Sequence, residues 1–254
     1  TNLIRIDLFS LVNKIKKINK NILKDISFLT ILYAIVALIP SFLAGYLVQI
    51  TGLKGFGNYS LAITFNQYLL VIPEYGFTLG AAKSLGEYQK DSNKKTHLFW
   101  SVQITRILLG LISYVILYIA TSYLGLFSDI KELINIGFLI VIGNILTQKW
   151  FYLGLGRMKL LMIITTIPKI LIIPLYLKYV RSEDDIKLVI LLHVIPIIIT
   201  AFISLVIIFS SKEIGPFIFS IKNIKNIIKK NFPLFLSNIS GKVYGLGTVL
   251  LLGI

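Results

Sequence analysis

The sequence contains no cysteine, and among its 254 residues only 2 are histidine and 11 are acidic. The absence of cysteine excludes disulfides, thiolate metal sites and cysteine nucleophiles. Two distant histidines without neighbouring carboxylates do not form a metal site. Charged residues make up only 15 % of the chain and the mean hydropathy is +0.84, whereas soluble domains carry about 25 % charge. These values favour an integral membrane protein over a soluble enzyme, and no cofactor or metal is expected.

The charge that is present is mostly basic. Lysine and arginine number 26 against 11 acidic residues, which gives a formal net charge of +15. Nucleic-acid-binding proteins also carry such an excess, but they spread it over a polar surface. Here the basic residues form short clusters between long apolar runs. The expected partners are therefore membrane lipids, and no nucleic acid.

Seven stretches are long and apolar enough to cross a bilayer, for which a helix needs about 20 residues. Residues 26–53, 55–73, 107–128 and 188–211 contain no Asp, Glu, Lys or Arg, and three further stretches hold a single lysine each. The sequence thus predicts an all-α polytopic membrane protein. The expected spans are 28–50, 57–80, 98–124, 134–153, 160–179, 187–210 and 232–254.

The basic residues lie mainly on one side of these spans. They precede the first span and occupy the second, fourth and sixth connections, while the other connections carry few. By the positive-inside rule, the N-terminus is expected in the cytoplasm.

Two lysine-rich segments show helical periodicity in their isoleucines and leucines. Residues 15–22 and 221–228 resemble each other, and each leads into an apolar span. Both fit basic amphipathic helices at the membrane surface, or solvated helices that only obey the positive-inside rule. An even number of spans separates them, as in transporters built from parallel repeats. The expected organisation is a cytoplasmic amphipathic helix at 1–25, a six-helix lobe at 26–210, a cytoplasmic basic linker at 211–231, and the first helix of a truncated second lobe at 232–254.

Four charged residues fall well inside predicted spans: Glu74, Arg106, Lys169 and Lys242. Each lies about ten residues, or roughly 15 Å, from the cytoplasmic end of its span. Charges at this depth are costly and are functional candidates by default. We therefore expect them to face one interior cavity, whose excess positive charge would attract an anionic group such as a phosphate.

Simpler interpretations exist for some polar groups in the spans. Glu74 could neutralise Arg106 in a structural ion pair. Lys149, beside Trp150, is expected to extend to the membrane surface near an aromatic belt. For His193, a buried packing position is favoured over a role in carrying protons.

Four motifs carry a resemblance to a known family. They are GLKGFGNYSLA at 52–62, EYGF at 74–77, GAAK at 80–83 and WFYLGLGRMK at 150–159. These motifs resemble Wzx-type O-antigen and polysaccharide flippases, of the multidrug/oligosaccharidyl-lipid/polysaccharide exporter superfamily, and the likeness covers essentially the whole chain. The motif residues are Gly55, Gly57, Tyr59, Gly76, Gly80, Trp150 and Gly154. The glycines at 52, 55 and 57 also fit a tight turn between two spans.

The resemblance implies a non-enzymatic transporter with two six-helix lobes around a cationic cavity. Its substrate would be undecaprenyl-pyrophosphate-linked oligosaccharide, flipped by alternating access from the cytoplasmic to the periplasmic leaflet of the bacterial inner membrane. Arg106, Lys169 and Lys242 match the positive cavity. A lipid-linked oligosaccharide and membrane lipids are the expected partners, with polysaccharide polymerase and glycosyltransferases as further candidates. The alternatives are a small-molecule exporter of the multidrug-and-toxin-extrusion type, a membrane polysaccharide polymerase and a non-transporting scaffold.

Overall fold

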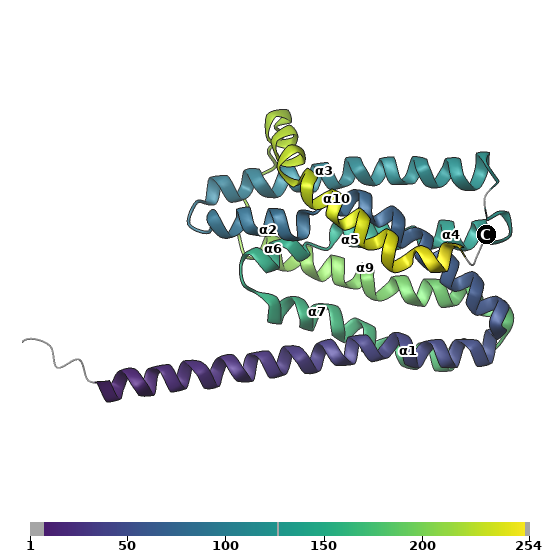
Figure 1. Ribbon diagram of the computed structural model, residues 1–254, viewed down its shortest axis with the longest axis horizontal. Coiled ribbons are helices and arrows are strands. Elements are labelled where there is room, and N and C mark those ends of the chain that lie inside the picture. The colour runs from purple at the N-terminus through teal and green to yellow at the C-terminus, as the bar shows by residue number, and fades with distance from the viewer. Residues whose placement is uncertain (1–7, 126, 252–254) are drawn as a thin grey trace, which may run out of the picture.

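The computed structural model describes the backbone of residues 8–125 and 127–251, and this part of the chain is helical with no β-strand (Figure 1). The predicted all-α class is therefore confirmed. The helices are α1 (Leu8–Glu74), α2 (Phe77–Glu87), α3 (Ser92–Tyr118), α4 (Lys131–Gly137), α5 (Leu139–Leu146), α6 (Lys149–Gly154), α7 (Met158–Leu171), α8 (Ile173–Tyr179), α9 (Ile186–Ser210) and α10 (Ile221–Leu251). A π-helical turn (Ile119–Tyr123) extends α3, and single 3₁₀ turns (Ser128–Ile130 and Glu183–Asp185) precede α4 and α9.

Five helical segments of the described chain are long and apolar enough to cross a membrane. They are Thr30–Glu87, Ser92–Tyr123, Ser128–Gly154, Met158–Tyr179 and Glu183–Ser210. The first has 58 residues, about 87 Å of helix against a hydrocarbon core of about 30 Å. It therefore contains two crossings, as the sequence predicted.

Gly52 separates those two crossings. Its backbone adopts φ 68° and ψ 175° inside α1, a region of the Ramachandran plot that is essentially restricted to glycine. In Figure 1, α1 runs along the bottom of the molecule, turns at the right and comes back through the bundle. The tight turn suggested by the three glycines thus occurs at Gly52, whereas Gly55 and Gly57 are helical.

Two predicted spans are interrupted. The fourth was expected as one helix over 134–153, but it consists of α4, α5 and α6, with Thr147 and Gln148 outside any helix. The fifth, expected over 160–179, divides into α7 and α8, and Pro174 lies in the first turn of α8. Both segments are long and apolar enough to cross a membrane, as expected. The expectation of one continuous helix was wrong for the fourth, and in the fifth only Ile172 separates the two helices. Non-helical backbone at membrane depth is tolerated where protein surrounds it or where it lines a cavity.

Helix α10 joins two segments that the sequence analysis separated. It begins at Ile221, within the expected linker 211–231, and continues to Leu251 in the seventh predicted span, whose last residues, 252–254, lie outside the described part. The non-helical connection from α9 is therefore confined to residues 211–220. Of the expected amphipathic helix at 1–25, residues 8–25 are helical and continuous with α1, while residues 1–7 lie outside the described part. Helix α10 packs against α1, α2 and α3, and whether it belongs to a second lobe stays a prediction.

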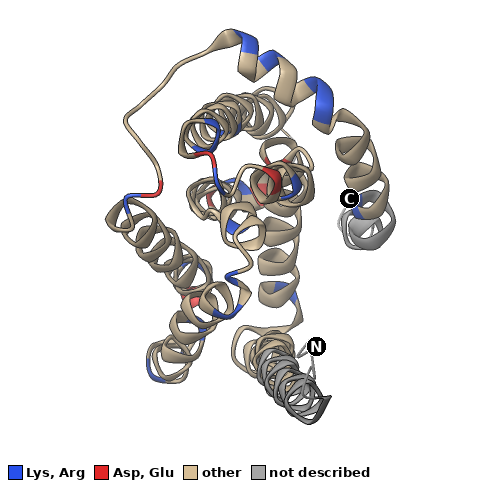
Figure 2. Cartoon of the chain, turned by 90° about the vertical axis from the view of Figure 1, so that its left-hand side faces the viewer, with Lys and Arg blue, Asp and Glu red and all other residues tan. Residues whose placement is uncertain are grey.

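The connections alternate between the two ends of the bundle, as expected for successive crossings. Those joining α2 to α3, α6 to α7 and α9 to α10 lie at the left in Figure 1, at the end where α1 begins. The Gly52 turn and the connections before α4 and α9 lie at the opposite end. Figure 2 views the first end and shows more basic than acidic ribbon there.

Candidate functional site

The larger cavity of the described structure has a volume of about 540 Å³, within the range of ligand sites. Both arms of α1, together with α7, α8, α9, α10 and the interrupted fourth span, contribute to its walls. Among the residues described, its charged lining consists of Glu74, Lys149, Lys169 and Lys242. The charge on the lining is therefore predominantly positive.

Three of the four predicted cavity charges come together here. Glu74 lies at the end of α1, Lys169 on α7 and Lys242 on α10, and all three line the cavity. None of the three makes a hydrogen bond or ion pair with another described residue. Lys169 and Lys242 therefore lack an acidic partner among the described residues, whereas Glu74 attracts Arg106 and Lys149 without an ion-pair contact. That they contact a substrate stays a prediction.

The fourth predicted charge, Arg106, lies outside the cavity lining. Its side chain on α3 is 5 % exposed, and Nη1 and Nη2 donate to the carbonyl oxygens of Thr147 (3.2 Å) and Asn144 (2.6 Å). An ion pair with Glu74, the alternative considered above, is not found among the described residues. Arg106 instead binds carbonyl groups that the end of α5 leaves without helical partners.

The break after α5 is held by a buried polar network centred on Gln148. Gln148 is fully buried, and its Nε2 donates to Oε1 of Gln103 at 2.7 Å. Its backbone N–H donates to Oγ of Ser204 at 3.3 Å, while its Oε1 accepts from Nε1 of Trp150 at 3.0 Å. These contacts connect the break to α3, α6 and α9, so that its polar groups are satisfied without water.

Because α6 starts immediately after this break, Lys149 is directed inward. Its Nζ donates to Oδ1 of Asn144 at 2.8 Å, and the residue lines the cavity. The expectation that Lys149 extends to an aromatic belt was therefore wrong, and Trp150 and Tyr152 are buried in the core. The Thr147–Gln148 pair within an apolar stretch was the only signal of the break.

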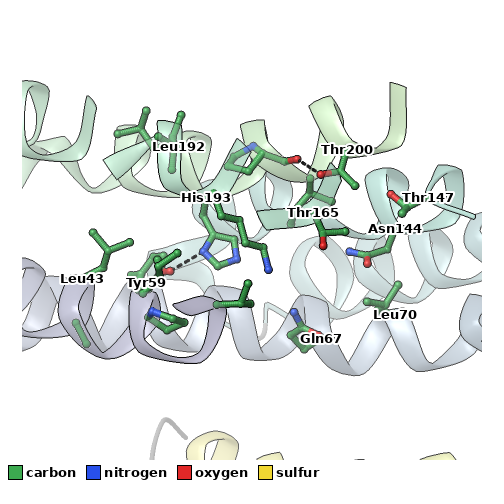
Figure 3. Close-up of a pocket in the computed structure, with 18 of the residues that line it drawn as sticks. Leu43, Tyr59, Gln67, Leu70, Asn144, Thr147, Thr165, Leu192, His193 and Thr200 are labelled. Carbon is green, nitrogen blue, oxygen red and sulfur yellow. Dashed lines mark hydrogen bonds between the residues drawn. The ribbon is translucent and has the colours of Figure 1, made fainter. Parts of the chain in front are cut away.

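Tyr59 and His193 meet at the cavity wall. The Tyr59 hydroxyl lies 2.8 Å from Nδ1 of His193, and both residues line the cavity (Figure 3). His193 is partly buried, but it faces the cavity instead of occupying an ordinary packing position. Of the seven motif residues singled out above, Tyr59 is the one found in the described cavity lining.

Neutral polar side chains complete the walls. In Figure 3, Gln67 faces Asn144, Thr147 and Thr165 across the space, and Thr200 lies on the wall behind them. These amide and hydroxyl groups offer both donors and acceptors. Apolar side chains occupy much of the remaining lining. The cavity thus combines cationic, neutral polar and apolar surface.

The other motif residues position helices around the cavity. Gly76 has φ 73° directly before α2, a conformation that favours glycine. A Cβ atom at Gly80 would collide with Asn231 and Leu234 of α10. Trp150 is 1 % exposed and packs in the aromatic core.

The remaining three glycines differ in how closely they are packed. A Cβ atom at Gly154 would lie 2.7 Å from the carbonyl oxygen of Ala82 and 2.8 Å from Cβ of Leu85, so that Gly154 allows α6 and α2 to approach. A Cβ atom at Gly55 would lie 2.8 Å from Cβ of Thr51, which also belongs to α1, whereas a Cβ atom at Gly57 would have no atom within 4 Å.

Comparisons with known proteins cover nearly the whole chain. A family described as "Polysaccharide biosynthesis protein" matches residues 22–254. Relatives from Escherichia coli (strain K12) and Shigella dysenteriae are both named "Putative O-antigen transporter". The first is 25 % identical over 230 residues, which cover 91 % of this chain and 55 % of the relative. The second is 26 % identical over 231 residues, which cover 90 % and 57 %.

The chain therefore spans about half the length of the curated relatives that it matches. No solved structure matches it at a significant level. The resemblance based on the four sequence motifs is confirmed at the level of the family.

Proposed function

Because the chain belongs to the polysaccharide biosynthesis protein family, we propose that it flips lipid-linked oligosaccharide for the assembly of surface polysaccharide. The transported molecule is an undecaprenyl-pyrophosphate-linked repeat unit, and it moves from the cytoplasmic to the periplasmic leaflet of the bacterial inner membrane. The names of the two relatives support transport of O-antigen.

The observation that carries this proposal is the cationic lining of the larger cavity. Lys169 and Lys242 have no partners among the described residues, and Lys149 binds only a neutral amide. A pyrophosphate would supply the missing negative charge, and its attraction to the lysines is strengthened where water is scarce. Gln67, Asn144 and the threonines supply hydrogen-bonding groups for sugar hydroxyls.

Alternating access requires helices that change shape around the bound substrate. The interrupted spans adjoining the cavity support such movement, because discontinuous helices form the substrate sites of many transporters. The same geometry also occurs in passive packing, so that transport itself must be measured.

We further propose that the N-terminus lies in the cytoplasm. The end of the bundle where α1 begins also holds the connections from α2 to α3, α6 to α7 and α9 to α10. These connections and their flanks carry most of the loop lysines and arginines. The positive-inside rule assigns that end to the cytoplasm.

The alternative functions receive less support. A drug exporter for organic cations would favour carboxylates in its cavity, and Glu74 is the one acidic residue among the described lining. A polymerase acting outside the cell would be expected to use a sizeable loop at the opposite end. There the described connections are short, at 124–125 with 127–130 and at 180–185.

The proposal is tested by lipid analysis of cells that lack the full-length gene, using a probe specific for one leaflet. We expect pyrophosphate-linked repeat units to accumulate on the cytoplasmic leaflet while surface polysaccharide is lost. Normal lipid intermediates together with normal polysaccharide would refute the flippase function and favour the drug exporter.

A further inference from the structure

A second cavity, of about 380 Å³, lies between the end of α2, the first turns of α3 and the first turns of α10. It shares no lining residue with the larger cavity. Its polar lining includes Lys94 and His97 of α3, and Asn223, Asn226 and Lys230 of α10. No Asp or Glu lines it among the residues described. Each described side chain that lines the second cavity is therefore either basic or neutral.

The position of the second cavity is at one end of the bundle. Tyr88, in the connection from α2 to α3, lines the cavity, and basic residues gather at this end (Figure 2). In a membrane, this end lies near the level of the lipid head groups. An anion could therefore reach the cavity without crossing the hydrocarbon core.

Local hydrogen bonds orient several donors around the second cavity. Nζ of Lys230 donates to Oγ of Ser84 at 2.8 Å, which places the ammonium group at the wall and leaves two of its protons available. The amide of Asn223 lies 3.4 Å from Nδ1 of His97. With that amide as donor, the other ring nitrogen of His97 carries a proton. Asn226 is exposed and makes no hydrogen bond with another described residue.

The nearest acidic contact involves Lys94. Asp91 lies outside the lining and forms an ion pair with Lys94 at 3.2 Å. It also accepts a hydrogen bond from the backbone N–H of Lys94, and this bond lowers the pKa of the Asp91 carboxyl below its ordinary value. Asp91 thus stays ionised and partly neutralises Lys94. Lys230 and His97 have no such acidic neighbour within 4 Å in the described structure.

We propose that the second cavity binds a phosphate group at the surface of the membrane. The oxygens of a phosphate accept several hydrogen bonds at once, and Lys230, His97 and Asn226 supply donors from two helices. The ammonium group of Lys230 adds a positive charge that is not offset by a carboxylate. The group belongs either to a lipid head group or to a soluble phosphate compound. This inference does not depend on which molecule the larger cavity transports.

A single engineered cysteine provides a local test, because the chain has no other. Leu98 lines the second cavity but is not one of the proposed donors, so Leu98→Cys reports on occupancy. The full chain is placed in maltoside micelles, whose detergent carries no phosphate, and the rate of alkylation is measured with and without inorganic pyrophosphate. A second arm adds phosphatidylglycerol to the micelles. We expect either pyrophosphate or phosphatidylglycerol to slow alkylation about fivefold or more.

Matched variants identify the cause of any protection. Lys230→Gln should abolish it, and Lys230→Arg, which keeps the charge, should retain it. Lys229→Gln removes the same charge from the adjacent residue, which is exposed like Lys230 but does not line the cavity, and should also retain protection. Lys169→Gln changes only the larger cavity and should have no effect on alkylation. Protection that survives in Lys169→Gln, even where transport is lost, would show that the phosphate site and the proposed transport function are independent.

Each result of this experiment is decisive. Protection by pyrophosphate alone supports a soluble phosphate compound, and protection by phosphatidylglycerol alone supports a lipid head group. Protection by both supports a site that accepts phosphate from either source. Absence of protection in both arms would overturn the proposal, as would equal protection in Lys230→Gln and Lys229→Gln.

Discussion

The hydroxyl of Tyr59 and Nδ1 of His193 lie 2.8 Å apart, and they join α1 to α9 at the wall of the larger cavity. The two residues are 134 positions apart in the sequence, and their rings meet edge to face with centroids separated by 6.0 Å. A tyrosine from a family motif is thus bonded to a histidine in a different span. This contact fixes the relative position of two helices that both face the cavity.

Tyr59→Phe removes this hydrogen bond while keeping the ring. Hydrogen bonds between membrane helices contribute about 0.6 kcal/mol on average and up to about 1.7 kcal/mol, so we expect a loss of stability in that range. Unfolding of the purified protein by a denaturing detergent would measure it. Tyr118→Phe, at a 57 % exposed position, is the control and should leave stability unchanged. Equal stability of the two variants would show that the Tyr59–His193 bond contributes nothing.

Lys169→Gln is expected to reduce flipping of lipid-linked oligosaccharide about tenfold or more. The reason is loss of one hydrogen bond to a charged group, which is worth about 1.5–3 kcal/mol. Transport per inserted molecule should be compared with that of Lys178→Gln, an exposed lysine outside the cavity lining. Wild-type transport by Lys169→Gln would remove Lys169 from the proposed substrate site.

Arg106→Gln is expected to lower the stability of the folded protein more than its transport activity. Its guanidinium donates to two buried carbonyl oxygens at the break after α5, and each unsatisfied group costs about 1–3 kcal/mol. The yield of folded protein in membranes should therefore fall before transport per folded molecule does. Normal yield together with lost transport would instead favour the sequence-based prediction that Arg106 binds the substrate.

Gly154→Ala should destabilise the packing of α6 against α2 by about 1–3 kcal/mol, a typical effect of overpacking. The added methyl group would press on the backbone carbonyl of Ala82 and on Leu85. Gly57→Ala makes the same chemical change where no atom lies within 4 Å, and it should be neutral or slightly stabilising. Thermal unfolding of both variants would measure the difference, and similar melting temperatures would contradict the prediction.

The proposed orientation can be tested with single cysteines in the cysteine-free chain. Asn93→Cys and Asp184→Cys introduce thiols at exposed positions at opposite ends of the bundle. In intact spheroplasts, a membrane-impermeant maleimide should label Asp184→Cys, whereas Asn93→Cys should react only after permeabilisation. The reverse pattern would place the N-terminus outside the cytoplasm.

Length and apolar composition were sufficient to predict the all-α class and the first two crossings, because a bilayer imposes these features on any spanning chain. The convergence of Glu74, Lys169 and Lys242 also followed from the sequence, since all three lie at a similar depth in their spans. However, the depth of a residue in the membrane does not say toward which side of its helix the side chain points. Arg106 lies at a similar depth but points toward backbone carbonyls instead of the cavity.

The interrupted fourth span could not be predicted from periodicity. Its break depends on partners supplied by distant helices, chiefly Gln103 and Ser204 around Gln148. Without knowledge of those partners, Thr147 and Gln148 are expected to belong to one continuous helix. Lys149 was misassigned for this reason, because its direction follows from the break and not from its distance to the span end.

The turn at Gly52 has a consequence for the insertion of the protein into its membrane. One residue with non-helical backbone connects the first two crossings, so almost no polar chain lies between them. With the proposed orientation, the charge that must be translocated with this hairpin is confined to Lys54, since residues 26–53 and 55–73 carry none. Passage of a charged side chain through the bilayer is the costly part of insertion. A short glycine turn therefore favours entry of both helices together as a hairpin during biogenesis.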